Sequence, residues 1–423
     1  MRQSPMGTLS KDRIYSFEKS IKLFERATKV IPGGIYGHQS PVLCVPGSFP
    51  YFIEKAEGSR FWDVDGNEYI DYMCAYGPMV VGYNNPRVEQ AARKQQEILN
   101  VSNLPGPLWV ELAERLVKQI PIADWVAFAK NGSDITTWSL QLAREYTKKK
   151  KVLVAKSTYH GTHAWCTPLP PGVTPEDRAN IVFFQWNDLD DFMKKYEANK
   201  NDFAGVIVTP FRHEAFENSA MPGPEYYKTI RKVCDDSNAI MIMDDVRCAL
   251  RLNLGGSNEY FGFKPDMICM SKAIANGHPL SVAAASAKLK GVASAVYFTG
   301  TYWSASPPMA AAMATLDELE EKDGVAYMDR IGKMLMDGLQ KLAASHGLQV
   351  TTSGPGAIPY MTFANEKDFR RMQLFSAEAT KRGVFFHPHH NWFVSTAHTE
   401  DDIKQTLEIA DVAFEIVKKK FGS

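Results

Sequence analysis

The sequence shows no excess of charge of either sign, no Cys-x-x-Cys pair and no long hydrophobic run. Lys plus Arg and Asp plus Glu each total 48, so no general basic surplus would draw the chain to nucleic acid or to an anionic membrane. The N-terminus lacks a signal-peptide apolar stretch, and no apolar run is long enough to cross a bilayer. We therefore expect a soluble, cytoplasmic protein with neither nucleic acid nor membrane among its partners.

The six cysteines are scattered along the chain, which favours reduced thiols over a disulfide framework in a protein of this size. Internal repeats and low-complexity linkers are absent as well. Hydrophobic residues make up 45% and charged residues 23% of the 423 residues, proportions that are ordinary for a globular protein. The chain is longer than one ordinary core needs, so one large and one smaller domain are expected.

The middle of the sequence alternates short apolar runs with helical stretches, which predicts βα units and a largely parallel, buried sheet. Its strands are expected at 125–129, 152–155, 205–209, 239–243 and 266–270. Nearer the N-terminus we expect a helix over 16–30 and a small β-meander over 51–72. Thr399 is the expected N-cap of a C-terminal helix.

These elements predict an α/β fold with two domains. The large domain, over 76–310, would hold a mostly parallel central sheet flanked by helices. The two chain ends, 1–75 and 311–423, would form a smaller α+β domain. Ligands bind beyond the carboxyl ends of the strands in open α/β sheets, so the residues that follow the expected strands are candidates for a site.

The first two of these strands lead into residues that could hold a phosphate and a flat ring. Gly132 and Ser133 begin a helix after the first strand. Glycine lets the backbone approach a ligand closely, and a helix N-terminus offers free N–H groups to a phosphate, although a bare turn with an N-cap serine has the same sequence. Tyr159 follows the second strand and could stack on a planar cofactor or be buried in the loop.

Asp244 and Lys272 follow two later strands, one βα unit apart. An acid after an apolar strand needs a partner, because burying an unpaired charge is costly, and a protonated pyridine nitrogen is one such partner. A lysine at a strand end is, by itself, more often a surface residue. The pair matches the electronic needs of pyridoxal 5′-phosphate (PLP), because the amine forms a Schiff base and the carboxylate keeps the ring nitrogen protonated.

An ordered set of motifs resembles the class III aminotransferases, and within them the glutamate-1-semialdehyde aminomutase-like branch, over nearly the whole chain. The set begins at residues 61–71 and continues through the Gly-Ser turn, residues 159–161, residues 244–246 and Lys272. It ends at residues 397–403. The resemblance implies PLP fold type I, with PLP as the cofactor.

The resemblance also implies a role for each matching residue. Lys272 would carry the Schiff base and move a proton between Cα and C4′, while Asp244 would pair with the pyridinium nitrogen. Tyr159 would stack on the ring, and Gly132 and Ser133 would hold the phosphate.

A further match implies an assembly. Thr301, with the glycine before it, resembles the segment that reaches the phosphate of the neighbouring subunit's cofactor. The family therefore implies a homodimer with shared active sites, whose small-molecule partners are an amino donor and a keto-acid acceptor.

The sequence departs from the family at positions that bear on the substrate. The branch has an arginine that grips a substrate carboxylate where this chain has Leu43, and a bidentate arginine is the usual way to hold a carboxylate. Glutamate-1-semialdehyde is therefore not the expected substrate. Arg212, which follows a strand end on the expected cofactor side, is our candidate to hold a carboxylate. For Arg247 and Arg251, pairing with nearby acids is favoured over substrate binding.

Two other groups of residues have competing interpretations. Tyr76 and Trp303 belong to a set of aromatic residues that could line an apolar substrate pocket or pack in the core. The histidines at 387–390 look like a metal cluster, but Pro388 fixes an extended backbone and no cysteine or acid is close in the sequence. We expect no metal site.

Three functions remain open. The leading hypothesis is an aminotransferase that moves an amino group between an amine or amino acid, β- or aromatic ones among them, and a keto acid. The second is an aminomutase or racemase that uses the same lysine. The third is a non-catalytic PLP-fold binding protein, which a missing Lys272 or Asp244 would favour, and both residues are present.

Overall fold

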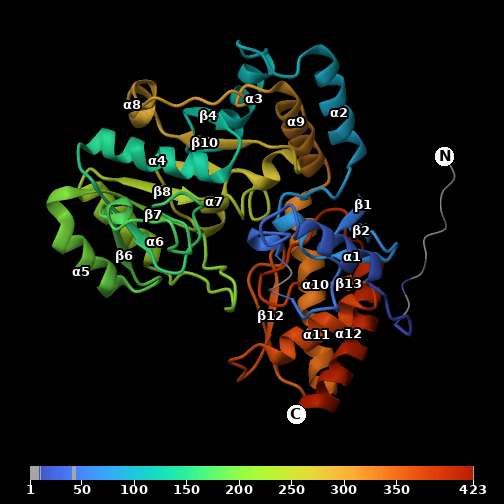
Figure 1. Cartoon of the computed structure of the whole chain (residues 1–423). Coiled ribbons are helices and arrows are strands. Elements are labelled where there is room, and N and C mark those ends of the chain that lie inside the picture. The colour runs from blue at the N-terminus through green and yellow to red at the C-terminus, as the bar shows by residue number, and fades with distance from the viewer. Residues whose placement is uncertain (1–8, 10, 41–43, 423) are drawn as a thin grey trace.

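A computed structural model describes residue 9 and residues 11–40 and 44–422, and its largest sheet has seven strands in the order β4-β10-β9-β8-β7-β5-β6 (Figure 1). These strands are β4 (Trp125–Ala129), β5 (Lys151–Ala155), β6 (Ile181–Phe184), β7 (Phe203–Val208), β8 (Ile240–Asp244), β9 (Met267–Met270) and β10 (Ser281–Ala285). Strand β10 is antiparallel to both of its neighbours, and all other pairs are parallel. The expected α/β class and the mostly parallel sheet are confirmed.

Helices cover both faces of this sheet, which explains why its central strands are apolar throughout. Helix α4 (Gly132–Thr147) packs on β7, β8, β9 and β10, and its apolar residues form one core cluster with those strands. Residues of α3 (Leu108–Gln119), α5 (Leu189–Asn199) and α6 (Tyr226–Asp236) belong to the core of the opposite face. Strands β7 to β10 are consequently buried at every position.

A second sheet joins the two ends of the chain. It contains β1 (Ile53–Glu57), β2 (Arg60–Asp63), β3 (Glu68–Asp71) and β13 (Val384–Phe385), and β13 pairs in parallel with β3. Helices α10 (Gly324–Ser345), α11 (Arg370–Thr380) and α12 (Glu400–Phe421) pack beside it, in the lower right of Figure 1. The boundaries expected at 75/76 and 310/311 stay a prediction.

Five α-helices and one hairpin remain among the described residues. They are α1 (Glu18–Ala27), α2 (Pro86–Ile98), α7 (Ser257–Phe261), α8 (Lys290–Ala295), α9 (Ser306–Glu321) and the hairpin of β11 (Val350–Ser353) and β12 (Tyr360–Phe363). Helix α2 packs along α9. The expected β-meander is present as β1, β2 and β3, and the expected N-terminal helix is the shorter α1.

The capping expected at Thr399 is confirmed by a reciprocal pair of hydrogen bonds. The Asp402 backbone N–H donates to Thr399 Oγ1 at 3.1 Å, and the Thr399 N–H donates to Asp402 Oδ2 at 2.9 Å. This pair satisfies two of the N–H groups that a helix leaves free at its first turn. Helix α12 therefore begins at a position that the sequence itself specifies.

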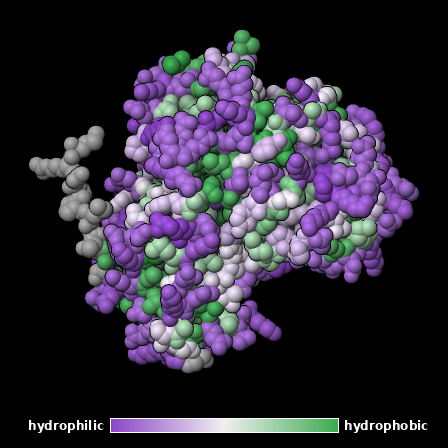
Figure 2. All heavy atoms as spheres, turned by 180° about the vertical axis from the view of Figure 1, so that it is seen from behind, coloured by the Kyte–Doolittle hydropathy of each residue, from purple (hydrophilic) through white to green (hydrophobic). Residues whose placement is uncertain are grey.

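Hydrophilic residues dominate the face turned to the viewer in Figure 2, and hydrophobic ones gather near its centre. All six cysteines are free. Among the described residues, no helix has both the length and the apolar character needed to span a membrane.

Candidate active site

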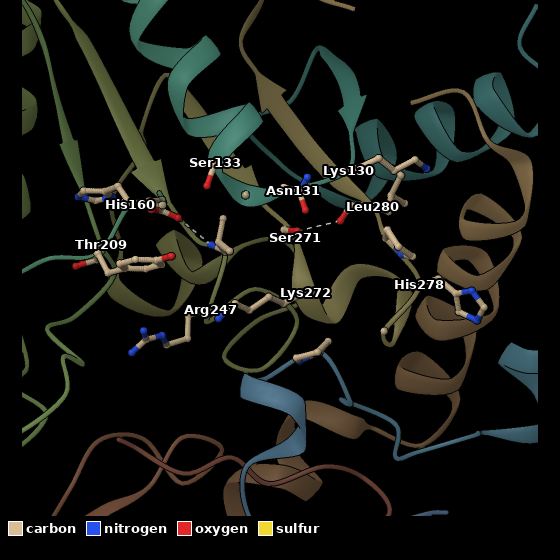
Figure 3. Close-up of a pocket in the computed structure, with 18 of the residues that line it drawn as sticks. Lys130, Asn131, Ser133, His160, Thr209, Arg247, Ser271, Lys272, His278 and Leu280 are labelled. Carbon is tan, nitrogen blue, oxygen red and sulfur yellow. Dashed lines mark hydrogen bonds and ion pairs between the residues drawn. The ribbon is translucent and has the colours of Figure 1, made fainter. Parts of the chain in front are cut away.

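A cavity of about 360 Å³ opens at the carboxyl edge of the large sheet (Figure 3). The residues that line it follow the ends of β4, β5, β7, β8 and β9. These strands run in one direction, so their carboxyl ends meet at one edge. Five residues for which the sequence predicts a contact with the cofactor share this one cavity: Gly132, Ser133, Tyr159, Asp244 and Lys272.

The N-terminus of α4 forms one end of the cavity. Its first N–H groups have no partner within the helix, which suits an anion such as phosphate. Ser133 Oγ accepts a hydrogen bond from the Thr162 N–H at 3.1 Å. Gly161 has φ +124°, and a Cβ there would lie 2.4 Å from Ser133 Oγ, so only glycine allows this close approach.

Asp244, the last residue of β8, is 5% exposed and held in one orientation. Its Oδ2 lies 2.7 Å from His160 Nδ1, and its Oδ1 accepts the Val246 N–H at 3.1 Å. The His160 ring is parallel to Trp165. The sequence motif at 159–161 contains His160 but does not reveal its contact with Asp244; its position next to Tyr159 is the one sequence feature that places it near the cavity.

The neighbouring Asp245 points elsewhere, because successive side chains of a strand lie on opposite faces of the sheet. Its carboxylate accepts hydrogen bonds from Ser257 Oγ at 2.6 Å and from the Ser257 N–H at 2.9 Å. Burial raises the pKa of Asp245 to about 7. Only Asp244 of the acid pair lines the cavity.

Lys272 brings an amine into the cavity. Its Nζ donates to the Tyr76 carbonyl oxygen at 3.0 Å. Burial, and then the charge of Arg247, lowers the pKa of Lys272 to about 7. An amine with this pKa is a free nucleophile at neutral pH to a far greater extent than an ordinary lysine.

The Tyr76 carbonyl is presented by an unusual left-handed turn. Cys74, Ala75 and Tyr76 have φ values of 46°, 53° and 65°, and Gly77 follows with 107°. Four successive residues therefore have positive φ. The Tyr76 side chain lines a separate cavity of about 290 Å³ and meets the His390 ring edge-on at 5.2 Å.

Several buried polar atoms around the Lys272 cavity have no hydrogen-bond partner among the described residues. They are Lys130 Nζ, Thr209 Oγ1 and both ring nitrogens of His213. Burial lowers the pKa of Lys130 to about 8 and holds the pKa of His213 well below its usual range. Buried polar groups are normally satisfied, so this set fits a cavity built for a polar ligand. Together with the amine and the anion-binding end, it fits PLP.

Besides Tyr76, three residues from the sequence analysis lie outside the Lys272 cavity. Thr301 is exposed and Trp303 is half-buried, and both line a separate groove of about 1310 Å³, where the Trp303 ring lies 4.2 Å from Phe298. Arg212 forms an ion pair with Glu217 at 2.9 Å. Nothing in the lining of the Lys272 cavity supports the substrate role expected of Arg212. Leu43 lies outside the described residues.

The expectation that Arg247 and Arg251 pair with acids is wrong. Arg251 is fully buried and donates to the carbonyl oxygens of Val394 and Gly77, the latter at 2.7 Å. Arg247 donates to the His213 carbonyl oxygen and to Asn391 Oδ1, and it lines the Lys272 cavity. Carbonyl and amide oxygens brought close by the tertiary fold took the place of carboxylates, which sequence spacing could not reveal.

Comparison with known proteins agrees with this arrangement. The family model for class-III aminotransferases matches residues 45–411. The aminopentol aminotransferase of Sphingopyxis macrogoltabida is 41% identical, over 95% of both chains. The 3-aminobutyryl-CoA aminotransferase of Cloacimonas acidaminovorans is 32% identical, over 95% of this chain and 98% of its own. A glutamate-1-semialdehyde 2,1-aminomutase of Desulforamulus reducens is 31% identical, over 96% and 99%.

A solved structure extends the agreement to the fold and the cofactor. The PLP internal aldimine form of the FumI protein of Sphingopyxis sp. MTA144 superimposes with a TM-score of 0.94 at 40% identity, over 96% of this chain and 98% of its own. The resemblance drawn from the motifs is thereby confirmed. The chain belongs to the class-III aminotransferase family, and it is an aminotransferase that uses pyridoxal 5′-phosphate.

Proposed function

We propose that this enzyme takes its amino group from a donor with a sizeable apolar or aromatic group near the reacting carbon, β-amino acids included, and passes it to a keto acid. The donor class follows from the sequence, where Leu43 replaces the arginine that the aminomutase-like branch uses for a compact carboxylate. The names of two relatives support a donor other than a compact dicarboxylate, since one is named for an aminopentol and the other for a 3-aminobutyryl thioester, which is a β-amino compound.

The observation that carries the chemistry is the placement of Lys272 and Asp244 in one cavity. Bound PLP supplies a carbonyl carbon that bonds to amines and a ring that withdraws electrons from it. Lys272 Nζ provides the amine that holds this carbon and moves a proton to and from the substrate carbon. Asp244, fixed by His160 and by the Val246 N–H, holds the proton at the ring nitrogen.

The other cavity residues orient the cofactor in this proposal. Ser133, Gly132 and the free N–H groups of α4 bind the phosphate. Tyr159 lies along the wall, and its backbone N–H donates to Glu214 Oε1 at 3.1 Å, which fixes the loop after β5. Burial raises the pKa of Tyr159, so the ring stays a neutral phenol against the flat cofactor.

The proposed enzyme is a cytoplasmic homodimer in which Thr301 of each chain serves the other chain's phosphate. Thr301 is exposed in the open groove, away from the cavity of its own chain. Trp303 lines the same groove, so a substrate contact by Trp303 would also be made in the neighbour's site. The free cysteines support a reducing compartment.

A spectroscopic half-reaction screen tests the donor class. The PLP-loaded enzyme is mixed with single donors, without acceptor, and the loss of its visible absorbance is followed. We expect aromatic and β-amino donors, and long-chain amines, to react faster than glutamate-1-semialdehyde. Faster reaction of glutamate-1-semialdehyde than of every apolar donor would overturn the proposal.

An aminomutase is the second candidate, since an aminomutase is 31% identical over nearly the whole chain. The two functions differ in their need for an acceptor. A mutase completes its turnover with one substrate, whereas the proposed enzyme stops after one equivalent of donor until a keto acid is added. Multiple turnovers in the absence of any keto acid would favour the mutase.

A further inference from the structure

Arg247 is a buried cation that lines the Lys272 cavity without an ion pair to any described residue. It comes three residues after the end of β8 and is 8% exposed. Its charge is strong enough at this place to lower the pKa values of Lys272 and His213. A charge buried without a counter-charge is costly, so a site that keeps one is expected to receive an anion.

The guanidinium is held from one side only. Nη1 donates to the His213 carbonyl oxygen and, at 3.0 Å, to Asn391 Oδ1. No described residue accepts a hydrogen bond from Nε or Nη2. These two nitrogens form one of the edges of the guanidinium that match the two oxygens of a carboxylate.

The acidic groups near Arg247 are engaged by other partners. Glu214 is hydrogen-bonded to the Tyr159 N–H, and burial raises its pKa, which weakens it as a counter-ion. Asp244 is held by His160 and the Val246 N–H. The Nε–Nη2 edge is therefore left for a group that the protein chain does not supply.

The position of Arg247 decides which anion this is. In Figure 3 the side chains of Arg247 and Lys272 lie on the side of the cavity opposite Ser133. The phosphate belongs at the Ser133 end, where the helix N-terminus offers N–H groups. An anion at the other end, beside the Lys272 amine, belongs to the molecule that reacts there.

We infer that Arg247 binds the carboxylate of the keto-acid acceptor, and that of any α-amino acid donor, through its Nε–Nη2 edge. This inference rests on the proposed transaminase function. A keto acid has its carboxylate next to the reacting carbonyl, which matches an arginine placed beside Lys272. When the donor is an amine without a carboxylate, Arg247 keeps its position, because the two hydrogen bonds from Nη1 hold the guanidinium in both half-reactions.

The test compares two acceptors that differ only in charge, pyruvate and methyl pyruvate, in the wild type and in Arg247→Gln. Loss of one charge-assisted, bidentate contact is expected to lower kcat/KM for pyruvate roughly 10²-fold. The value for methyl pyruvate, and the rate of the donor half-reaction with a neutral amine, should change by no more than about threefold, because neither involves a carboxylate.

Two variants serve as controls. Arg247→Lys keeps the positive charge but lacks the two parallel N–H donors of the guanidinium. Its ratio of kcat/KM for pyruvate to kcat/KM for methyl pyruvate should therefore lie between the ratios of Arg247→Gln and the wild type. Arg212→Gln removes an arginine that lies outside the cavity, and it should leave both acceptors unaffected. The visible band of the PLP-loaded enzyme should have the same wavelength in all four proteins when it is measured at a pH that keeps the lysine nitrogen in one protonation state.

Two results would overturn the inference. Equal losses for pyruvate and methyl pyruvate, together with a shifted visible spectrum, would mean that Arg247 contacts the cofactor's ring oxygen and not the substrate. An unchanged pyruvate preference in Arg247→Gln would mean that it binds no substrate anion.

A binding measurement separates this inference from the proposed function. The melting temperature of the PLP-loaded enzyme is followed in the presence of butyrate or butyramide, neither of which reacts. Stabilisation by butyrate alone, lost in Arg247→Gln, would support the carboxylate site even if no donor and acceptor pair were turned over. Equal stabilisation of the wild type and Arg247→Gln by butyrate would contradict it.

Discussion

The Lys272 cavity and the groove that contains Thr301 are built in opposite ways. The cavity lies at the ends of fully buried strands, and its acid and its amine each have hydrogen-bond partners within the chain. Thr301 lies in the connection between α8 and α9 and is exposed in an open groove. The hydrogen bonds that hold the acid and the amine of the first region all come from one chain. Thr301 in the second region would have a part in catalysis only in the proposed dimer.

The largest effect should come from the residue that is most enclosed. Lys272→Ala should still bind PLP but lose turnover by several decades, since both the covalent anchor and the proton carrier disappear. In the wild type, borohydride should attach PLP to one peptide that contains Lys272, as mass spectrometry can show. Labelling at a different lysine would contradict the assignment.

A smaller effect separates the two acids at the end of β8. Asp244→Asn should lower kcat by roughly 10²-fold or more, because the ring nitrogen loses the charge that holds its proton. Asp245→Asn should act on stability instead. If Asp245→Asn damaged turnover more than Asp244→Asn, the acid that faces the cofactor would have been misassigned.

The pH dependence of stability gives Asp245 its own signature. Burial raises its pKa in the folded protein to about 7, above the value of about 4 in an unfolded chain. The folded state thus binds the proton more tightly, and the stability this provides below about pH 4 is lost as the pH rises through 7. The free energy of unfolding, measured by denaturation at several pH values, should therefore fall as the pH rises from about 4 through 7. Asp245→Asn should remove this pH dependence, while Asp244→Asn should retain it.

The smallest signal is expected from the groove, as a partial recovery of activity in a mixture of two variants. Thr301→Asp would place a negative charge against the neighbour's phosphate and should inactivate the proposed dimer. Mixing it with inactive Lys272→Ala should recover roughly a quarter of wild-type activity, because about half of the dimers are hybrids and each hybrid has one intact site. Full activity of Thr301→Asp, or of a monomer in sedimentation, would show that the groove has no part in catalysis.

Much of the enclosed region could be predicted from the sequence. Apolar runs that end in Asp244 and Lys272 specify buried strands, and parallel strands bring their carboxyl ends to one edge. Strand β10 was missed, because Ser-Val-Ala-Ala-Ala has few of the β-branched and aromatic side chains that mark strands. Strand β6 was missed as well, although its Ile-Val-Phe-Phe run carries that mark.

The side chains that orient the site were harder to foresee. The contact of His160 with Asp244 joins positions 84 residues apart, and that of Arg247 with Asn391 joins positions 144 residues apart. The sequence favours Arg212 as the carboxylate ligand because it follows a strand end on the expected cofactor side, and it favours pairing with acids for Arg247. Sequence spacing does not show that Arg247 lines the cavity and contacts Asn391, in the segment after β13.

The left-handed turn at Cys74, Ala75 and Tyr76 limits which substitutions can be used to change the amino donors that the enzyme accepts. Each non-glycine residue in this conformation costs about 1 kcal/mol, and the fold retains three in a row to aim one carbonyl at Lys272. The contact with the amine is made by the main chain, so the side chain at 76 can be varied in a library without deleting that contact. Glycine at 75 is the substitution that would relax the turn, and proline, with its fixed negative φ, is the one to leave out.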